Sequence, residues 1–369
     1  MFLPDFKNSI VNVSASMSRY LGNNPNHCGI KILDEALSKN PQNVVFFVID
    51  ALGVDVIERI LPVDSVLRKN IVAKVTSVFP STTPTGTTSL QSAMTPGEHG
   101  WLGWSLQHDD NIIEIFKGTD YYTRELVYPD FPTKQMAYDF IWKKHNPDIE
   151  THSFRQPGMK FKVVADNDHK FSNTHELQVG LQKILVTPAK KFVYVYMDYI
   201  DQLIHDFGVF HKKVRRCAKK LNAMFEHFLA KTKDTLFVIT ADHGAIDIAD
   251  YVPIYKDTAL MKCLSAPPSM DVRATVFHVK PGMDSEFKTA FNAYKADFDL
   301  YTTNELIKRG VFGPTVHEKW RNKLGDFIAV GNESNKCFQF KKGQAILAGH
   351  HTGLTKGEML VPLVLLRCK

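Results

Sequence analysis

Four runs of apolar, β-branched and aromatic residues stand out along the chain, and each is long enough to form one buried strand. They lie at residues 44–49, 192–197, 236–240 and 361–366. Within each run the apolar residues follow one another without regular polar positions between them. This pattern is typical of a parallel sheet that helices cover on both faces. We therefore predict a central sheet built from these runs.

Helical patterns lie between the strand runs, and the clearest covers residues 214–228. Its apolar positions are spaced by four, three, four and three residues: Val214, Ala218, Leu221, Phe225 and Phe228. Lysines and arginines at 212–220 occupy the other faces. A basic helix can bind nucleic acid, but a stripe that docks the helix on a core favours a solvated outer face. The alternation of strands and helices predicts an α/β fold with an open, mostly parallel sheet sandwiched by helices.

Two segments fall outside this alternation. Residues 107–185 are polar and aromatic with several turn signals, and residues 255–340 open with Pro267-Pro268. In the second segment, 274–279 and 327–330 are strand-like, and Phe287, Phe291 and Tyr294 form a helical stripe. We read both segments as insertions on the central sheet. The predicted division is a core of residues 1–254 and 341–369 and a small α+β insertion at 255–340.

The composition agrees with a globular protein. Hydrophobic residues make up 44% and charged residues 23% of the 369 positions, which excludes a disordered, collagenous or coiled-coil chain. No apolar run reaches the ~18 residues of a membrane-spanning helix, and the N-terminus has no signal-like apolar region. The five cysteines form no CxxC pair. We therefore expect a reduced, cytoplasmic protein without a membrane partner. The net charge of +6 mildly favours anionic substrates but does not indicate nucleic acid.

Acidic and imidazole side chains follow three of the strand runs. Asp50 ends the first run, Asp198 ends the second with Asp201 and His205 just beyond, and Asp242-His243 ends the third. Ligands of open α/β sheets bind outside the carboxyl ends of the strands. Carboxylates that meet there repel one another unless cations lie among them, and a mixed Asp/His set suits zinc. Asp201 and His205, four residues apart, would share one helical face. His350-His351, after Ala348-Gly349, offers one more imidazole.

A run rich in hydroxyl groups, residues 81–88, follows the apolar stretch 71–78 and precedes a helical pattern through Leu90 and Met94. A hydroxyl at a strand-to-helix turn lies near free backbone N–H groups and the positive end of the helix dipole. It can attack or hold an anion, and a metal ion would make it a better nucleophile. The alternative is that these residues only cap the helix.

The same segments resemble the alkaline phosphatase superfamily and, more narrowly, its type I phosphodiesterase/nucleotide pyrophosphatase branch and the predicted bacterial relatives of that branch. The resembling segments occur in the family's order. They are VVFFVIDALG (44–53), FPSTTPTGTTSLQSAMTPGEHGWLGW (79–104), DQLIH (201–205), ITADHG (239–244) and GHHTGLTKGEMLVPL (349–363). The resemblance implies an alkaline phosphatase-like core.

The resemblance also implies roles for seven residues around two divalent ions, Zn²⁺ with Mn²⁺ as the alternative. One ion would be held by Asp50, Thr83, Asp242 and His243, and the other by Asp201, His205 and His351. The family places its nucleophilic threonine sixteen residues before the His of a His-Gly pair, here His99, which selects Thr83 over Thr82 and Thr85. His350 is the alternative to His351. Asp198 either supports the ligands from behind or has a structural role, because the DxxxH spacing assigns the ligand to Asp201.

The chain departs from the family at a position that usually carries an Asn three residues after the nucleophile. Gly86 stands there, and we expect a backbone N–H or Thr87 to hold the phosphoryl oxygen instead. Neither the arginine of the phosphate-monoesterase members nor the sulfatase signature is evident. Arg273 contacts substrate phosphate or has a surface role, and Trp101 and Trp104 either wall the pocket or anchor loops.

These features predict a two-metal phosphodiesterase or nucleotide pyrophosphatase. Thr83 would attack phosphorus, form a covalent phospho-threonine and release it to water, with net retention of configuration at phosphorus. The expected substrate is a small phosphate ester or nucleotide. A phosphomonoesterase, phosphonate hydrolase or mutase of the same superfamily is the first alternative. A metal-binding, nucleic-acid-associated protein with a vestigial active site is the second.

Overall fold

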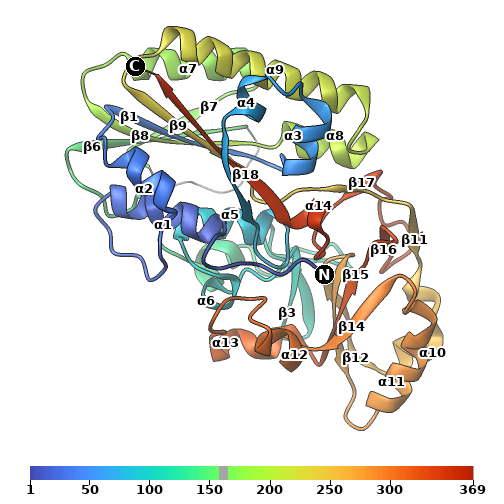
Figure 1. The fold of residues 1–369 in the computed structure, drawn as a ribbon. Helices are drawn as coiled ribbons and strands as arrows, with labels where there is room; N and C mark the ends of the chain where they lie inside the picture. The colour runs from blue at the N-terminus through green and yellow to red at the C-terminus, as the bar shows by residue number, and fades with distance from the viewer. Residues whose placement is uncertain (158–164, 369) are drawn as a thin grey trace.

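The computed structural model describes residues 1–157 and 165–368, which form two sheets and their covering helices (Figure 1). The larger, central sheet has seven strands in the order β2-β18-β9-β1-β8-β6-β7. Their bounds are β1 Asn43–Ile49, β2 Ile71–Thr76, β6 Ile149–Arg155, β7 Asn167–Lys170, β8 Lys190–Met197, β9 Thr235–Thr240 and β18 Leu360–Cys368. The four apolar runs of the sequence are β1, β8, β9 and β18, so the predicted central sheet is confirmed.

The central sheet is parallel except for one strand. β1 pairs in parallel with both β8 and β9, with Val45 opposite Val193 and Phe237. β18 runs antiparallel to both β9 and β2. The prediction of a mostly parallel sheet is confirmed, but the run at 361–366 is not one of its parallel strands. An all-apolar run indicates that a strand is buried on both faces, but it does not indicate whether the strand is parallel or antiparallel to its neighbours.

Helices cover both faces of this sheet, as Figure 1 shows. On one face lie α3 Val54–Ile60, α4 Val66–Lys69, α7 Thr174–Leu185, α8 Tyr199–Phe207 and α9 Lys212–Lys231; on the other lie α1 Ile10–Tyr20, α2 Lys31–Leu37 and α5 Thr83–Ser92. The predicted apolar stripe of α9 is completely buried, and its lysines and arginines point away from the core. Among the described residues, none of the helices combines the length and the apolar character that crossing a bilayer requires.

The second sheet is antiparallel and has the order β14-β15-β13-β12-β3-β4-β5. Four of its strands are β12 Leu264–Met270, β13 Ala274–Val279, β14 Phe298–Thr302 and β15 Phe327–Gly331. The other three come from a distant segment: β3 Ser105–His108, β4 Asn111–Glu114 and β5 Thr119–Asp120. Its helices are α10 Thr258–Lys262, α11 Asp284–Phe291, α12 Thr303–Lys308 and α13 Glu318–Arg321. Pro267-Pro268 lies inside β12, where the pairing with β13 shifts register.

The segment 107–185 is therefore not one insertion. Its first part joins the second sheet through β3, β4 and β5, whereas β6, β7 and α7 complete the central sheet. Residues 158–164 of this segment lie outside the described residues. β7 is short and polar and has no apolar run from which a strand could be predicted. It is recognised as a strand by its parallel pairing with β6. The division of the chain into a core and a 255–340 insertion stays a prediction.

Two small strand pairs bring the C-terminal loop beside the end of β9. β10 Ile246–Asp247 pairs antiparallel with β17 Gly349–His350, so Ile246 lies opposite His350. β11 Asp250–Val252 pairs with β16 Lys336–Phe338. The short helices α6 Pro96–His99 and α14 Lys356–Met359 complete the fold. Residues 242–243 and 350–351 are thereby held next to each other.

A buried ion pair fastens the second sheet to this C-terminal loop. Arg273, at the turn between β12 and β13, donates from Nε to Glu358 Oε1 at 2.7 Å, and both side chains are fully buried. Glu358 also accepts hydrogen bonds from Gly353 N at 2.8 Å and from Thr355 N at 3.1 Å. Arg273 therefore has neither of the roles expected for it, because its guanidinium is fully buried and is not among the described residues that line the cavity beside the carboxylates.

Glu358→Gln should lower the free energy of unfolding by ~3–5 kcal/mol, because it leaves the Arg273 charge buried without its counter-charge. Urea denaturation of the two proteins measures the difference. The matched control is Glu35→Gln, which breaks the exposed Lys31–Glu35 pair and should change little. An equal, small effect of both substitutions would contradict the structural role of the buried pair.

Candidate metal centre and active site

Three carboxylates converge at the carboxyl edge of the central sheet. Asp50 follows β1, Asp242 lies just beyond β9, and Asp201 lies in the first turns of α8, after β8. Because β1 is hydrogen-bonded to both β8 and β9, these three ends meet at one place. The side chains are buried, with exposed fractions of 1% for Asp50, 0% for Asp242 and 8% for Asp201. Such burial of like charges is unfavourable unless positive charge is supplied.

The first group of side chains surrounds the ring of His243. Its Nε2 lies 3.2 Å from Asp50 Oδ1 and 3.5 Å from Asp242 Oδ2. The hydroxyl of Thr83 lies 3.3 Å from the same Nε2 and donates to Asp50 Oδ2 at 3.4 Å. Tyr196 on β8 also donates to Asp50 Oδ2. The four residues predicted for one ion thus share one small volume.

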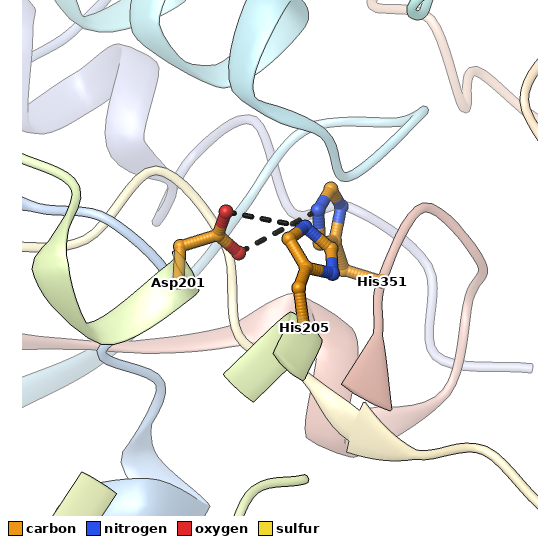
Figure 2. A group of neighbouring side chains, drawn as sticks. All are labelled: Asp201, His205 and His351. Carbon is orange, nitrogen blue, oxygen red and sulfur yellow. Dashed lines mark ion pairs between the residues drawn. The ribbon is translucent and has the colours of Figure 1, made fainter. Parts of the chain in front are cut away.

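The second group is formed by Asp201, His205 and His351. As Figure 2 shows, the three side chains point toward one another from α8 and from the loop after β17. Asp201 Oδ2 lies 3.2 Å from His205 Nε2, and Asp201 Oδ1 lies 3.8 Å from His351 Nε2. The i, i+4 spacing on α8 gives Asp201 and His205 the common face that the sequence predicts.

The two groups adjoin each other. The rings of His243 and His351 are stacked, with centroids 3.8 Å apart and planes inclined by 22°. One oxygen of Asp201 also lies within 4.8 Å of ligand atoms of both Asp50 and His243. Asp201 therefore lies between the two groups, which is an arrangement that can hold two neighbouring cations.

Backbone carbonyls orient the three histidines. His205 Nδ1 contacts Gly349 O, His243 Nδ1 contacts Gly244 O, and His351 Nδ1 contacts Ser81 O, each at 2.9 Å. A carbonyl oxygen only accepts, so each Nδ1 carries a proton and each Nε2 faces the cluster. This orientation is typical of metal-ligating histidines.

His350 is placed differently from its neighbour. Its Nδ1 lies 2.9 Å from the backbone N of His351 and 3.0 Å from the carbonyl oxygen of the same residue. Burial lowers the pKa of His350 to about 3. Among the described residues, His351 and not His350 forms a group with Asp201 and His205.

The electrostatics of the cluster indicate missing positive charge. Burial and the charges of Asp242 and Asp201 raise the pKa of Asp50 well above its usual value. Burial also raises the pKa of Asp242. Burial alone would lower the pKa of His205, but the Asp201 carboxylate raises it to about 9. Asp50 Oδ1, Asp201 Oδ1 and Asp242 Oδ2 are buried oxygens without a hydrogen-bond partner. Unpartnered carboxylate oxygens facing imidazole nitrogens fit divalent cations.

The contacts of the Thr82, Thr83 and Thr85 hydroxyls distinguish Thr83 from the other two candidate nucleophiles. Thr82 donates from Oγ1 to Asp271 Oδ2 at 3.4 Å, and Thr85 Oγ1 accepts from Gly103 N at 3.1 Å. Only the hydroxyl of Thr83, among these three, contacts Asp50 and His243. Thr83 is also the first residue of α5, where backbone N–H groups are free to face an anion.

Gly86 and Thr87 are already engaged within α5. Gly86 N donates to Thr82 O at 2.8 Å, and Thr87 Oγ1 donates to Thr83 O at 2.5 Å. A Cβ on Gly86 would lie 2.7 Å from Asp242 O, so the helix needs glycine here to approach the end of β9. Neither residue is among the described residues that line the cavity, and their role as substrate contacts stays a prediction.

A cavity of about 370 Å³ opens onto Thr83, Asp201, His205 and His351. Its further walls come from both sheets and from the 340–347 loop, and they include Trp104, Tyr121, Arg124, Glu114, Tyr251, Asp271 and Phe340. Trp104 therefore walls the pocket, whereas Trp101 is a buried loop anchor whose Nε1 donates to Met136 O at 2.8 Å. Asp198 is the N-cap residue of α8 and accepts from Gln202.

Sequence reasoning missed two polar side chains of this site. Tyr196 lies inside an apolar strand run, where a tyrosine resembles any other core residue. Asp271 lies in a segment read as a separate insertion, and only the pairing of β12 with β3 brings it to the pocket. The signal that could have pointed to Asp271 is its place between a Pro-rich segment and a strand.

Comparison with known proteins identifies the family and similar folds. The model of the family described as type I phosphodiesterase/nucleotide pyrophosphatase matches residues 44–352. No curated protein matches the sequence. Murine ectonucleotide pyrophosphatase/phosphodiesterase 5 has a similar fold, with a TM-score of 0.62 and 14% identity over 87% of each chain. An inactive form of it in complex with AMP gives a TM-score of 0.61, with the same identity and coverage.

A bacterial enzyme has a similar fold as well. Phosphonoacetate hydrolase from Sinorhizobium meliloti 1021 gives a TM-score of 0.62 at 14% identity, over 89% of this chain and 91% of that chain. These structures support the alkaline phosphatase-like architecture. With the family match over most of its length, the chain belongs to the type I phosphodiesterase/nucleotide pyrophosphatase family and is a metal-dependent hydrolase of phosphoric esters.

Proposed function

We propose that this protein is a two-metal phosphodiesterase or nucleotide pyrophosphatase in which Thr83 is the nucleophile. One observation carries the proposal. The Thr83 hydroxyl lies at the start of a helix, 3.4 Å from Asp50 and 3.3 Å from His243, and faces the cavity. A hydroxyl placed among candidate metal ligands, with free backbone N–H groups beside it, is positioned to attack phosphorus.

The residues divide into two ligand sets. Asp50, Thr83, Asp242 and His243 would hold one ion, and Asp201, His205 and His351 the other. Two bound divalent ions supply positive charge that activates a hydroxyl or water and stabilises the oxygens on phosphorus. Three imidazoles among the donors favour zinc over manganese. Gly244, Gly349 and Ser81 keep the imidazoles oriented through their carbonyl groups.

The chemistry of the chain itself is a double displacement. Thr83 Oγ1 forms a bond to phosphorus while the bond to the leaving oxygen breaks, which gives a phospho-threonine. Water then cleaves this ester and frees Thr83. Two in-line displacements give net retention at phosphorus. The N-terminus of α5 stabilises the negative charge on the phosphoryl oxygens during both steps.

The cavity supports a small phosphate ester or nucleotide as substrate. Trp104, Tyr121 and Phe340 provide aromatic surface next to the candidate ligands. Aromatic side chains of this kind can stack on a planar group such as a nucleobase. The complex of the murine protein with AMP is consistent with a nucleotide-sized ligand in this fold.

Thr83→Ala should reduce hydrolysis of bis-p-nitrophenyl phosphate by about 1,000-fold or more, because it removes the attacking oxygen and leaves the other six ligands. Release of p-nitrophenol by the zinc-loaded protein measures the rate, and elemental analysis measures bound zinc. Thr83→Ser should retain partial activity.

The matched control for this substitution is Thr85→Ala, two residues further along the same helix. It removes the acceptor of Gly103 N, so it should lower stability by ~1–3 kcal/mol while turnover persists. Full activity of Thr83→Ala would exclude Thr83 as the nucleophile. Loss of zinc and of folding in Thr83→Ala would instead assign the residue a structural role.

Metal removal should reverse the pH dependence of stability between pH 7 and 9. Asp201 raises the pKa of His205 from 6.5 to about 9, so without metal its contribution to stability is complete below pH 6.5. That contribution is lost as the pH rises toward 9, by up to ~1.4 kcal/mol per pH unit. The raised pKa values of Asp50 and Asp242 act in the same direction. With zinc bound, the ligands are deprotonated and binding strengthens as the pH rises.

Thermal melts at pH 7 and pH 9, with EDTA and with zinc, test this expectation. The melting temperature should fall with pH in EDTA and hold or rise in zinc. The pKa values of His350 and His351 lie below 6.5, so these side chains are neutral throughout this range and add no slope. Equal slopes in EDTA and zinc would contradict metal binding by this cluster.

A further inference from the structure

Asp271 is a carboxylate that faces the cavity and belongs to neither ligand group. It lies at the turn between β12 and β13 and lines the same cavity as Thr83, Asp201 and His205. Its Oδ1 accepts from Val272 N at 2.7 Å, and its Oδ2 accepts from Thr82 Oγ1 at 3.4 Å. The second bond ties the carboxylate to the residue that precedes the candidate nucleophile.

His205 is the described cavity residue whose charge lowers the pKa of Asp271, and as a metal ligand this imidazole would be neutral. Apart from histidines, Arg124 is the one basic residue among the described lining residues. Its guanidinium is already paired with Glu114, at 2.8 Å, and Glu114 also contacts Lys117 at 3.2 Å. The remaining wall is largely apolar or aromatic, including Trp104 and Phe340. Asp271 therefore adds negative charge to the space beside the candidate phosphoryl site.

The negative charge of Asp271 matters because of the charge balance at the candidate metal centre. Two divalent ions would neutralise the three carboxylates of Asp50, Asp201 and Asp242 and one further negative charge. A phosphodiester brings one negative charge to the site, whereas a phosphomonoester in alkaline solution brings two. Like charges in a partly desolvated cavity repel more strongly than in water. The second charge of a monoester would therefore meet Asp271 without compensation.

We propose that Asp271 is a specificity-determining residue, which favours singly charged phosphodiesters by repelling the doubly charged phosphoryl group of monoesters. The inference rests on the proposed function, because it assumes that the phosphoryl group lies beside Thr83. Burial raises the pKa of Asp271 to about 6, and so the carboxylate is ionised at the alkaline pH of the test. Its role is electrostatic selection, distinct from metal ligation and from attack on phosphorus.

The test compares kcat/KM for bis-p-nitrophenyl phosphate and p-nitrophenyl phosphate at pH 8 in the zinc-loaded full chain. Asp271→Asn removes the charge and keeps an acceptor for Val272 N. The diester-to-monoester ratio should fall by about tenfold, mainly because monoester turnover rises. Asp271→Glu keeps the charge and should keep the preference. Asp198→Asn, a matched loss of charge near α8 but outside the cavity lining, should leave the ratio unchanged.

A binding measurement tests the same inference without turnover. Calorimetric titration with inorganic phosphate at pH 8 should show about tenfold tighter binding to zinc-loaded Asp271→Asn than to the unaltered protein. If the Asn variant does not fold, Asp271→Ser, which also removes the charge, takes its place in both assays.

Three outcomes would overturn the inference. They are an unchanged ratio and phosphate affinity in the folded Asn or Ser variant, a parallel loss of both activities, and an equal shift of the ratio in Asp198→Asn. Failure of the proposed function would give a different experimental result from failure of the inference about Asp271. In that case the unaltered protein hydrolyses neither ester in a Thr83-dependent way, and the phosphate titration alone decides the role of Asp271.

Discussion

Three buried carboxylates at one edge of a sheet impose the constraint on which the rest of this structure depends. Asp50, Asp201 and Asp242 each keep one oxygen that no hydrogen bond satisfies. Burial and mutual repulsion make the ionised forms of Asp50 and Asp242 unfavourable. The parallel pairing of β1 with β8 and β9 fixes the strand ends that hold them together, so the backbone cannot relieve the repulsion by moving apart. Protons or bound cations can compensate this charge, and the three imidazoles beside the carboxylates are candidate ligands for such cations.

The second sheet completes the site from the opposite side. One turn, between β12 and β13, presents Asp271 to the cavity and sends Arg273 into the protein to pair with Glu358. Glu358 in turn accepts from Gly353 N, two residues beyond His351. The same turn therefore contributes to the pocket wall and anchors the loop that carries a candidate ligand. Through this turn the antiparallel sheet contributes to the same cavity as the candidate ligands at the edge of the central sheet.

The sequence made part of this structure predictable, for a clear reason. Buried strands such as β1 and β9 can be recognised from their apolar runs alone. Asp50, Asp242 and His243 come immediately after these runs in the sequence, so their place at the strand ends could be predicted as well. The antiparallel direction of β18, the union of β3 with β12, and the burial of Arg273 depend on contacts between distant segments. Asp271 was missed for the same reason, since contacts with segments distant in sequence, such as the one with Thr82, bring it to the cavity. The resembling motif favoured His351 over His350, and the position of His351 beside Asp201 and His205 now gives that choice a geometric basis.

The central claim is that two cations occupy the carboxylate cluster, and anomalous diffraction from zinc-soaked crystals tests it most directly. Data collected on both sides of the zinc absorption edge should show two peaks, roughly 4 Å apart as in other two-metal sites. One peak should lie among Asp50, Asp242 and His243 and the other among Asp201, His205 and His351. A fully soaked crystal with no zinc peak at this edge of the sheet, or with one elsewhere on the chain, would contradict the account.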